Sequence, residues 1–273
     1  MPTVLVTGAA RGIGKTIVTH LSTAGWDVVA GVRSRSDADA LAALPRVSAV
    51  LLDVTDDEQV SALPAHLPER LDAVVNNAGI AVSGPIEALT AAQLRQQFDV
   101  NVVGQLAVTN AVLPSLRAAG GRVVFISSVN GRISLPLLGA YSASKFALEA
   151  AADALRLELK PWKIAVSVIE PAQTDTDLWR KADDAVDAME ASMSAAQRAL
   201  YAKHVVGMRK SIPLSQRLAV PAEKVAAVVE QALTARSPRA RYPVGIGPAV
   251  QMGVVTSLPT MLRDQLIGRL TGI

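Results

Sequence analysis

Apolar residues in the first two-thirds of this chain follow two alternating patterns. Short runs that are apolar almost throughout alternate with longer segments in which apolar residues recur every three or four positions. The short runs predict strands buried on both faces, and the longer segments predict amphipathic helices. The predicted strands are Thr3–Val6, Asp27–Gly31, Val47–Leu52, Leu71–Val75, Arg122–Ile126 and Ile164–Ile169, and the predicted helices are Gly14–Ala24, Asp37–Ala43, Asp56–Leu63, Ala91–Arg117 and Tyr141–Lys160. This alternation predicts an α/β fold, with a doubly wound parallel sheet in three layers α/β/α.

We predict a single domain over residues 1–273, because no repeat and no flexible linker divides the chain. Residues from about 175 to 215 are rich in Ala, Met and charge, and we predict a helical insert there that covers the substrate. An apolar C-terminal segment spans about residues 243–273, and Val244–Leu262 has no charged residue. Prolines and glycines interrupt it, so we predict a broken, amphipathic or substrate-covering segment and not a transmembrane helix; peripheral membrane contact stays open.

The amino-acid composition excludes several classes of function. The chain has no cysteine, which excludes disulfides, thiol nucleophiles and cysteine metal sites. His20, His66 and His204 are scattered without metal-ligand spacing, so no metal is predicted. The net charge is +3 without a basic block interleaved with aromatic residues, so we expect no nucleic-acid partner. The chain enters a predicted strand at once with no signal-peptide pattern, which predicts a cytoplasmic location.

A glycine-rich loop follows the first predicted strand, where residues 7–14 read TGAARGIG. Glycine allows a tight turn and close approach of the backbone to a phosphate. The start of the next helix offers unpaired N–H groups and the positive end of its dipole. The alternative is an ordinary glycine-rich turn, but its place between a strand and a helix favours a nucleotide-phosphate site.

Tyr141 and Lys145 stand four residues apart at the start of a predicted helix, which places a phenol and an ammonium on one helix face. A phenol normally titrates near pH ~10, and a neighbouring cation lowers that value. The pair is therefore a candidate general acid–base centre, and its alternative is a solvated helix face. More polar residues, Asn76–Gly79, Ser127 and Ser128, follow the fourth and fifth predicted strands, where doubly wound sheets bind their ligands.

Together these motifs resemble the short-chain dehydrogenase/reductase family over about the first two-thirds of the chain. The resemblance rests on the 7–14 loop, Asn76-Asn77-Ala78-Gly79, Asn101, Ser128, Tyr141, Lys145 and Pro171, in the order and spacing of that family. Ser128 precedes Tyr141 by the family's usual interval of thirteen residues, which selects Ser128 over Ser127. The resemblance implies a Rossmann-like fold and an oxidoreductase that acts on CH–OH groups. One departure is Ala172, where the family often has glycine, so we expect a differently shaped loop near the nicotinamide.

The resemblance implies a role for each of four catalytic residues. Tyr141 would exchange the hydroxyl proton of the substrate, and Ser128 would hydrogen-bond the substrate oxygen. Lys145 would lower the pKa of Tyr141 and bond the nicotinamide ribose. Asn101 would hold a water that links Lys145 to solvent, or, alternatively, would only bond nearby backbone. Thr176 would bond the carboxamide of the nicotinamide.

Basic residues near the second predicted strand favour NADP(H) over NAD(H). An acidic residue at the strand end would bond the 2′-hydroxyl of NAD and repel a 2′-phosphate, but this chain has Val32 there, followed by Arg33. With Arg11 in the glycine loop, two guanidiniums can bind one phosphate, and Ser34 would add a hydroxyl contact. Asp53 resembles the family residue that bonds the adenine amino group; its alternative is a cap of the next helix. The full set of predicted cofactor-binding residues is Thr7, Gly8, Arg11, Gly12, Ile13, Gly14, Arg33, Ser34, Asp53, Val54, Asn77, Ala78, Gly79, Tyr141, Lys145, Pro171, Thr174 and Thr176.

The segment before Tyr141 is apolar and includes Ile133, Leu135, Leu137 and Leu138. It favours an apolar ligand, and the alternative is that these residues are core or a subunit contact. The chain resembles loosely the branch with retinol- and hydroxysteroid-like dehydrogenases. We therefore predict hydride transfer between NADP(H) and a hydrophobic alcohol or carbonyl substrate, such as a retinoid-, steroid- or other lipid-like compound. The alternative function is a catalytically silent NADP(H)-sensing module that regulates a partner.

Small residues on the predicted Tyr141–Lys160 helix favour a homodimer or homotetramer. Ala147, Ala150, Ala151 and Ala154 would allow this helix to approach its copy across a two-fold axis, as the family resemblance implies. The alternative is that these alanines pack only against the sheet of their own subunit.

Overall fold

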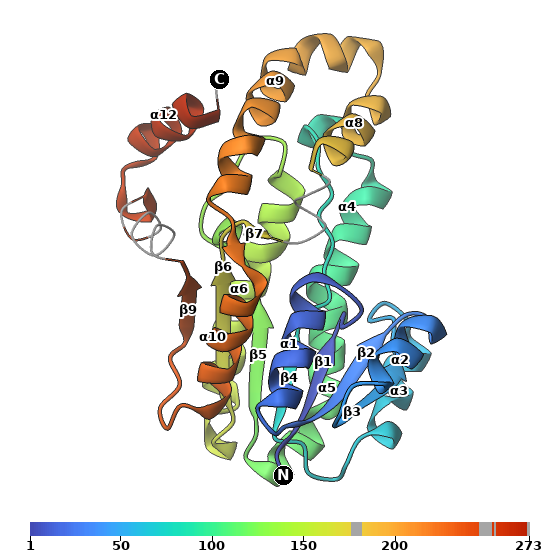
Figure 1. Ribbon diagram of the computed structural model, residues 1–273. Coiled ribbons are helices and arrows are strands. Elements are labelled where there is room, and N and C mark those ends of the chain that lie inside the picture. Colours follow the sequence, from blue (N-terminus) through green and yellow to red (C-terminus); the bar gives the residue numbers. More distant parts are fainter. Residues whose placement is uncertain (176–181, 246–252, 254, 272–273) are drawn as a thin grey trace.

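A computed structural model describes residues 1–175, 182–245, 253 and 255–271. Within them, one sheet of seven parallel strands has the order β3-β2-β1-β4-β5-β6-β9, and helices cover both of its faces (Figure 1). The strands are β1 Thr3–Thr7, β2 Asp27–Val32, β3 Val47–Leu51, β4 Ala73–Asn76, β5 Arg122–Ile126, β6 Ala165–Pro171 and β9 Arg241–Val244, while β7 Thr174–Asp175 and β8 Val220–Pro221 pair separately. The strand order reverses between β1 and β4, which confirms the predicted doubly wound sheet.

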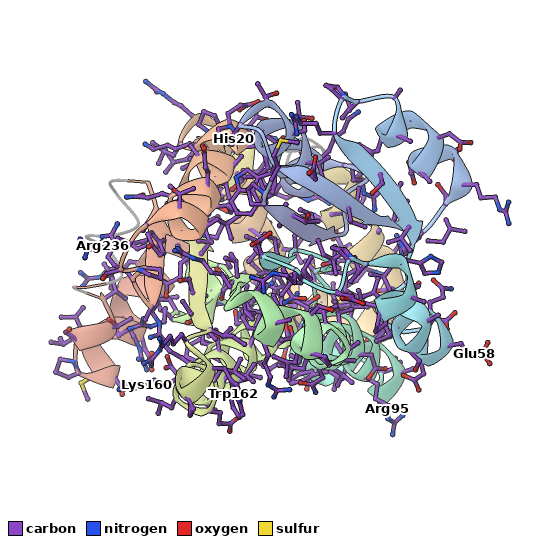
Figure 2. The ribbon with its side chains drawn as sticks, turned by 90° about the horizontal axis from the view of Figure 1, so that it is seen from below. His20, Glu58, Arg95, Lys160, Trp162 and Arg236 are labelled. Carbon is purple, nitrogen blue, oxygen red and sulfur yellow. The ribbon has the colours of Figure 1, made fainter. Side chains whose placement is uncertain are left out.

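Two apolar layers hold the helices against the sheet. The helices are α1 Gly12–Thr23, α2 Arg35–Ala42, α3 Asp57–Ala62, α4 Ala91–Phe98, α5 Gly104–Ala119, α6 Gly139–Glu158, α8 Ala182–Ser192, α9 Ala195–Arg217, α10 Ala222–Thr234 and α12 Thr260–Thr271. Val4 and Val6 belong to a core layer with α1 and α10, whereas Leu5 faces a second layer with α5 and α6. Figure 2 shows His20 of α1 and Trp162, which follows α6, on opposite sides of the sheet. None of the described helices is long and apolar enough to cross a bilayer.

The segment Ala91–Arg117 is not the single helix that its pattern predicts. α4 ends at Phe98, a π-helical turn covers Asp99–Val103, and α5 then begins at Gly104. Inside this turn, the amide of Asn101 accepts from the N–H of Ile80 at 2.8 Å and donates to its carbonyl at 3.0 Å. Such turns inside helices often occur at functional sites. Periodicity could not predict this turn, because its partner lies in another loop.

The sequence pattern also missed β9 and α10. β9 has only four residues and contains Pro243, which a strand tolerates at the edge of a sheet. α10 did carry a usable signal, since Val225, Val229 and Leu233 recur every four residues and all are buried.

The predicted insert contains the helices α8 and α9. Met189 of α8 and Val205 and Ile212 of α9 form a third apolar cluster with Leu137, which lies just before the helix of Tyr141. Figure 1 shows both helices beyond the carboxyl ends of the strands. That these helices cover a substrate at this edge stays a prediction.

Candidate active site

The glycine-rich loop after β1 is packed too closely for side chains. Gly8 has a φ of 63°, and a Cβ there would lie 2.8 Å from Cα of Ala78. A Cβ at Gly14 would lie 2.2 Å from the carbonyl oxygen of Gly8. No side chain caps the start of α1, where Arg11 is the N-cap residue. The loop and helix start therefore form a backbone cradle that fits the phosphates of a nucleotide.

The cradle is joined to the loop after β4. The buried hydroxyl of Thr7 accepts from the N–H groups of Asn77 and Ala78, each at 3.0 Å. The Asn77 amide donates back to the carbonyls of Thr7 and Gly8 at 3.0 and 3.1 Å. Two loops that are about 70 residues apart in the chain are thus held together at the switch point of the sheet.

We predict that Gly14→Ala weakens NADPH binding by roughly 5- to 150-fold and lowers the melting temperature, because overpacking against a fixed backbone costs roughly 1–3 kcal/mol. The methyl group would collide with the Gly8 carbonyl and displace the phosphate cradle. Cofactor titration and thermal unfolding measure the two effects. Gly253→Ala is the matched control, since no atom of the described residues lies within 4 Å of a Cβ there. Unchanged NADPH affinity in Gly14→Ala would show that the loop does not bind the cofactor.

The predicted ribose side of the site lies at the ends of β1 and β2. Val32 is the last residue of β2 and is buried, while Arg11 and Arg33 are exposed on neighbouring loops. The Ser34 hydroxyl caps α2 by accepting from the N–H of Asp37 at 3.1 Å, and it lies 2.5 Å from the Asp37 carboxylate. A contact between Ser34 and a 2′-phosphate would therefore compete with Asp37, and it stays a prediction.

Asp53 is not the cap of α3, because Asp56 caps that helix and accepts from the N–H groups of Glu58 and Gln59. Asp53 instead accepts from the backbone and hydroxyl of Thr55 at 3.0 and 2.7 Å. Burial acts to raise the pKa of Asp53, but the Thr55 hydrogen bonds and the charge of Arg33 together lower it. Its carboxylate therefore stays charged and able to accept from an adenine amino group. The capping alternative for Asp53 was wrong.

Ser128 and Tyr141 meet at the carboxyl edge of the sheet. Ser128 follows β5 and its hydroxyl accepts from the N–H of Asn130 at 3.1 Å, while Tyr141 lies in the first turn of α6. Burial raises the pKa of Tyr141 above its usual value of 10, and a hydrogen-bonding contact with Ser128 opposes that rise. The two hydroxyls are thus placed to act on one substrate oxygen.

Lys145 is almost fully buried one turn further along α6. Its Nζ donates to the carbonyl oxygen of Ile126 at 2.8 Å and lies 5.8 Å from the ring centre of Tyr141. Burial lowers the pKa of Lys145 to about 8, against an opposing effect from Glu149. The sequence led us to expect that Lys145 lowers the pKa of Tyr141; instead, burial raises that pKa.

The side chain of Asn101 is buried and bonded to protein on every donor. Besides its two bonds to Ile80, it donates to the Ser144 hydroxyl at 3.2 Å. This matches the alternative that it bonds nearby backbone. That Asn101 holds a water for Lys145 stays a prediction, and it concerns the groups of Asn101 that make none of these bonds.

Other predicted cofactor residues have varied surroundings. Pro171 ends β6 and is buried, and the buried hydroxyl of Thr174 donates to the carbonyl of Ala172 at 3.1 Å. Val54 is buried and its carbonyl faces Gly104, where a Cβ would lie 2.5 Å away. Thr176, predicted to bond the carboxamide, lies outside the described residues. Because the Thr174 hydroxyl already donates to Ala172, it can meet a donor group of the cofactor as an acceptor.

Sequence reasoning missed polar side chains that support the site from behind. Buried Gln97 accepts from the N–H of Val82 at 2.7 Å and donates to the carbonyl of Ile80 at 3.0 Å. Gln105 donates to the carbonyl of Ala78 at 2.6 Å. Gln97, Asn101 and Gln105 recur at four-residue intervals on one helical segment, and this polar stripe in an apolar context was the available signal.

Known proteins resemble this chain in sequence and in structure. The model of the short chain dehydrogenase family matches residues 2–187. Retinol dehydrogenase 5 of Mus musculus is 33% identical over 277 residues, which cover 97% of this chain and 87% of that protein. The NADPH-dependent 3-dehydrocapnine reductase of Ornithobacterium rhinotracheale is 32% identical over 274 residues, which cover 96% of this chain and 94% of that protein.

A solved structure leads to the same family. A short-chain dehydrogenase from Streptomyces avermitilis has a TM-score of 0.77 and 29% identity, and the match covers 99% of this chain and 94% of that one. The resemblance seen in the motifs is therefore confirmed along the rest of the chain. Because the family model covers more than half of the chain and the relatives align over nearly all of it, this protein belongs to the short-chain dehydrogenase/reductase family of oxidoreductases.

Proposed function

We propose that this protein transfers a hydride between NADP(H) and a hydrophobic alcohol or carbonyl substrate. The observation that carries the proposal is the contact of Ser128 with Tyr141, beside Lys145, at the same sheet edge as the glycine cradle. A silent cofactor-binding module would have no need of these groups in this arrangement. The intact set therefore favours an enzyme over the sensing alternative.

Proton transfer in the proposed reaction belongs to Tyr141. NADP(H), when bound, supplies or accepts the hydride at its nicotinamide. In the direction of reduction, the Tyr141 hydroxyl donates its proton to the substrate oxygen, and Ser128 hydrogen-bonds that oxygen as negative charge develops. Because burial raises the pKa of Tyr141, the phenol holds its proton at neutral pH and is ready to act as an acid. Lys145 places a positive charge beside this step and would bond the nicotinamide ribose.

The proposed preference for NADP(H) rests on charge. Arg11 and Arg33 are exposed on loops that adjoin each other, since the N–H of Ala9 donates to the carbonyl of Gly31 at 3.1 Å. Val32 supplies no carboxylate at the strand end. The reductase from Ornithobacterium rhinotracheale, which aligns along almost the whole chain, is described as NADPH-dependent. These observations favour a 2′-phosphate in this pocket.

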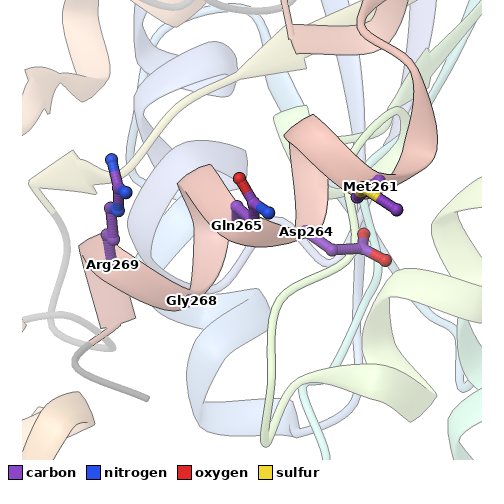
Figure 3. A pocket seen from close by; sticks show the side chains of 5 residues that line it. All are labelled: Met261, Asp264, Gln265, Gly268 and Arg269. Carbon is purple, nitrogen blue, oxygen red and sulfur yellow. The ribbon is translucent and has the colours of Figure 1, made fainter.

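The proposed substrate class rests on a cavity next to α6. The cavity has a volume of about 490 Å³ and is bounded by the loop before Tyr141, by α9 and by α12. Its lining is mostly apolar: Pro85, Ile86, Ser134, Leu135, Pro136, Leu137, Gly139, Tyr201, His204, Asp264, Ile267 and Gly268. A second hollow of about 520 Å³ is lined only by residues of α12 (Figure 3). Neither lining includes Ser128, Tyr141 or Lys145, but the first cavity is bounded by residues 135–139, the segment that leads into the helix of Tyr141. We therefore propose the first cavity as the site for an apolar substrate.

A panel of hydrophobic ketones, aldehydes and secondary alcohols tests the proposed function. We expect NADPH oxidation with some carbonyl compounds, and weaker or no reaction with NADH. Tight NADPH binding without turnover of any compound would favour the sensing module. Equal use of NADH and NADPH would contradict the proposed cofactor preference.

We predict a homo-oligomer, with a mass of at least twice 28.5 kDa in sedimentation at micromolar concentration. Ala150, Ala154, Phe146 and Leu157 form an exposed stripe at helical spacing on α6, so these alanines do not pack only against their own sheet. Small residues in such a stripe allow close helix approach across a two-fold axis. Ala150→Arg should shift the mass toward 28.5 kDa if the stripe is the contact. A monomeric parent protein would contradict the prediction.

A further inference from the structure

A buried cluster of charged side chains lies one helical turn beyond Lys145 on α6. Glu149, one turn after Lys145 on α6, is 4% exposed, and Glu170 near the end of β6 is 2% exposed. Arg241 of β9 donates through Nε to Glu149 at 3.0 Å, and the same nitrogen is 3.6 Å from Glu170. Arg132, in the loop after β5, reaches Glu170 at 3.4 Å. The mechanism described above uses none of these four residues.

Arg241 links this cluster to the protein surface. Its Nη2 donates to Asp153 at 2.7 Å, and Asp153 also accepts from Arg156 at 2.9 Å. Strand pairing fixes the arginine backbone, because Arg241 lies opposite Val168 in the parallel pair of β6 and β9. The guanidinium is thus held between α6 and the edge of the sheet.

Burial disfavours the charged forms of the two glutamates of the cluster. It raises the pKa of Glu149, while nearby Ser127 and the guanidiniums of Arg241 and Arg132 oppose the rise. It also raises the pKa of Glu170, and the charge of Glu149 adds to that effect. A buried carboxylate remains ionised only where paired cations offset its loss of hydration. The guanidiniums are therefore needed if Glu149 is to carry its charge.

The charge of Glu149 acts on Lys145. No hydrogen bond joins the two side chains among the described contacts, and Nζ of Lys145 donates to Ile126 instead. The interaction is electrostatic, across one helical turn in a region shielded from water. Burial of Lys145 favours the neutral amine, and Glu149 favours the ammonium.

We propose that Glu149 is a positioning residue that keeps Lys145 in its charged form beside Tyr141, and that Arg241 in turn keeps Glu149 ionised. The groups that face Glu149 are Lys145 and Asp153 from α6, Glu170 from β6, Arg241 from β9, and Arg132 with Ser127 after β5. The consequence for turnover rests on the proposed function, but the effect on the charge of Lys145 does not. The missed strand β9 thereby gains a role in the site.

The first test measures Lys145 directly, in protein carrying ¹³C-labelled lysine, with Lys145→Met identifying its resonance. In Glu149→Gln we expect the NMR titration midpoint of Lys145 to fall by roughly one pH unit or more, because a neighbouring negative charge is removed. Such a fall leaves about tenfold less ammonium relative to amine at a given pH above both midpoints. Arg241→Gln should lower the midpoint as well, and Arg241→Lys should restore most of it.

Arg156→Gln is the matched control, since Arg156 pairs with Asp153 but not with Glu149. It should leave the Lys145 midpoint unchanged. Coincident midpoints in the parent protein and Glu149→Gln would overturn the proposal. If Glu149→Gln does not fold, Arg241→Gln provides the comparison, and Glu149→Asp, which keeps a carboxylate, should leave the midpoint close to that of the parent protein.

The second test is the pH profile of kcat for NADPH-dependent reduction. The ammonium form of Lys145 supports turnover at pH values below the titration midpoint of this residue, and it is lost as the pH rises through that midpoint. The alkaline fall of kcat should therefore begin at lower pH in Glu149→Gln. A merely structural glutamate would lower kcat at every pH without moving the fall. A parent protein without turnover would contradict the proposed function alone, and the NMR comparison would still decide the charge of Lys145.

Discussion

Replacing Tyr141 by phenylalanine is expected to lower turnover by ~10² to 10⁴-fold, the usual contribution of a general acid–base group. The substitution keeps the ring on α6 and removes only the hydroxyl that carries the proton. The contact with Ser128 is lost at the same time, but the glycine cradle and Lys145 are untouched. NADPH affinity and the melting temperature should therefore change little. Single-turnover NADPH oxidation with the best substrate of the panel measures the loss.

Tyr242→Phe is the matched control for this prediction. Tyr242 is a buried tyrosine of β9 whose hydroxyl accepts from the N–H of Arg239 at 2.9 Å. The substitution therefore removes the same kind of hydroxyl group at a position outside the cavity. Its turnover should stay within a few-fold of the parent protein. A Tyr141→Phe variant that retained half of the parent activity would remove Tyr141 from the proposed mechanism.

Replacing Arg33 by alanine is expected to weaken NADPH binding by roughly 1.5–3 kcal/mol, the contribution of a hydrogen bond to a charged group. This corresponds to a roughly 10- to 150-fold higher Kd. NADH has no 2′-phosphate, so its affinity should hardly change. The side chain is exposed beside the buried Val32 and supports no core contact, so the fold should persist. Fluorescence titration with both cofactors measures the two affinities.

Arg46→Ala controls for a general loss of positive charge. Arg46 precedes β3 at the other end of the sheet and pairs with Asp27 at 3.2 Å. Its loss should leave both cofactor affinities unchanged. Equal weakening of NADPH and NADH by Arg33→Ala would show that Arg33 supports the loop and does not bind the 2′-phosphate.

Local patterns predicted the fold well wherever one segment carried its own signal. The six predicted strands lie within about two residues of β1 to β6, because runs of buried aliphatic residues identify strands of a parallel sheet. The same reasoning missed the π-helical turn inside the predicted helix Ala91–Arg117, where Asn101 bonds to Ile80 of another loop. It failed also at β9, whose four residues become a strand only by pairing with β6.

The candidate site likewise has features that local patterns predicted and features that they did not. Spacing selected Tyr141, Lys145 and the glycine loop, because turns and helix faces place residues by their distance along the chain. Ser128 was selected over Ser127 by the interval of the family that the motifs resemble. Spacing did not predict that burial would raise the pKa of Tyr141, since burial depends on what covers the helix. It also gave no sign that Glu149 and Arg241 would meet.

The sequence by itself determined the alternation of strands and helices, the glycine-rich loop after β1 and the spacing of Tyr141 and Lys145 on α6, because each is a local arrangement of neighbouring residues. Only the tertiary structure decided what lies against them. It brought Asn77 to Thr7, Arg241 to Glu149, and α9 and α12 to the cavity before Tyr141. Those contacts join segments far apart in the chain, and they set the burial and charge on which the acid–base groups depend.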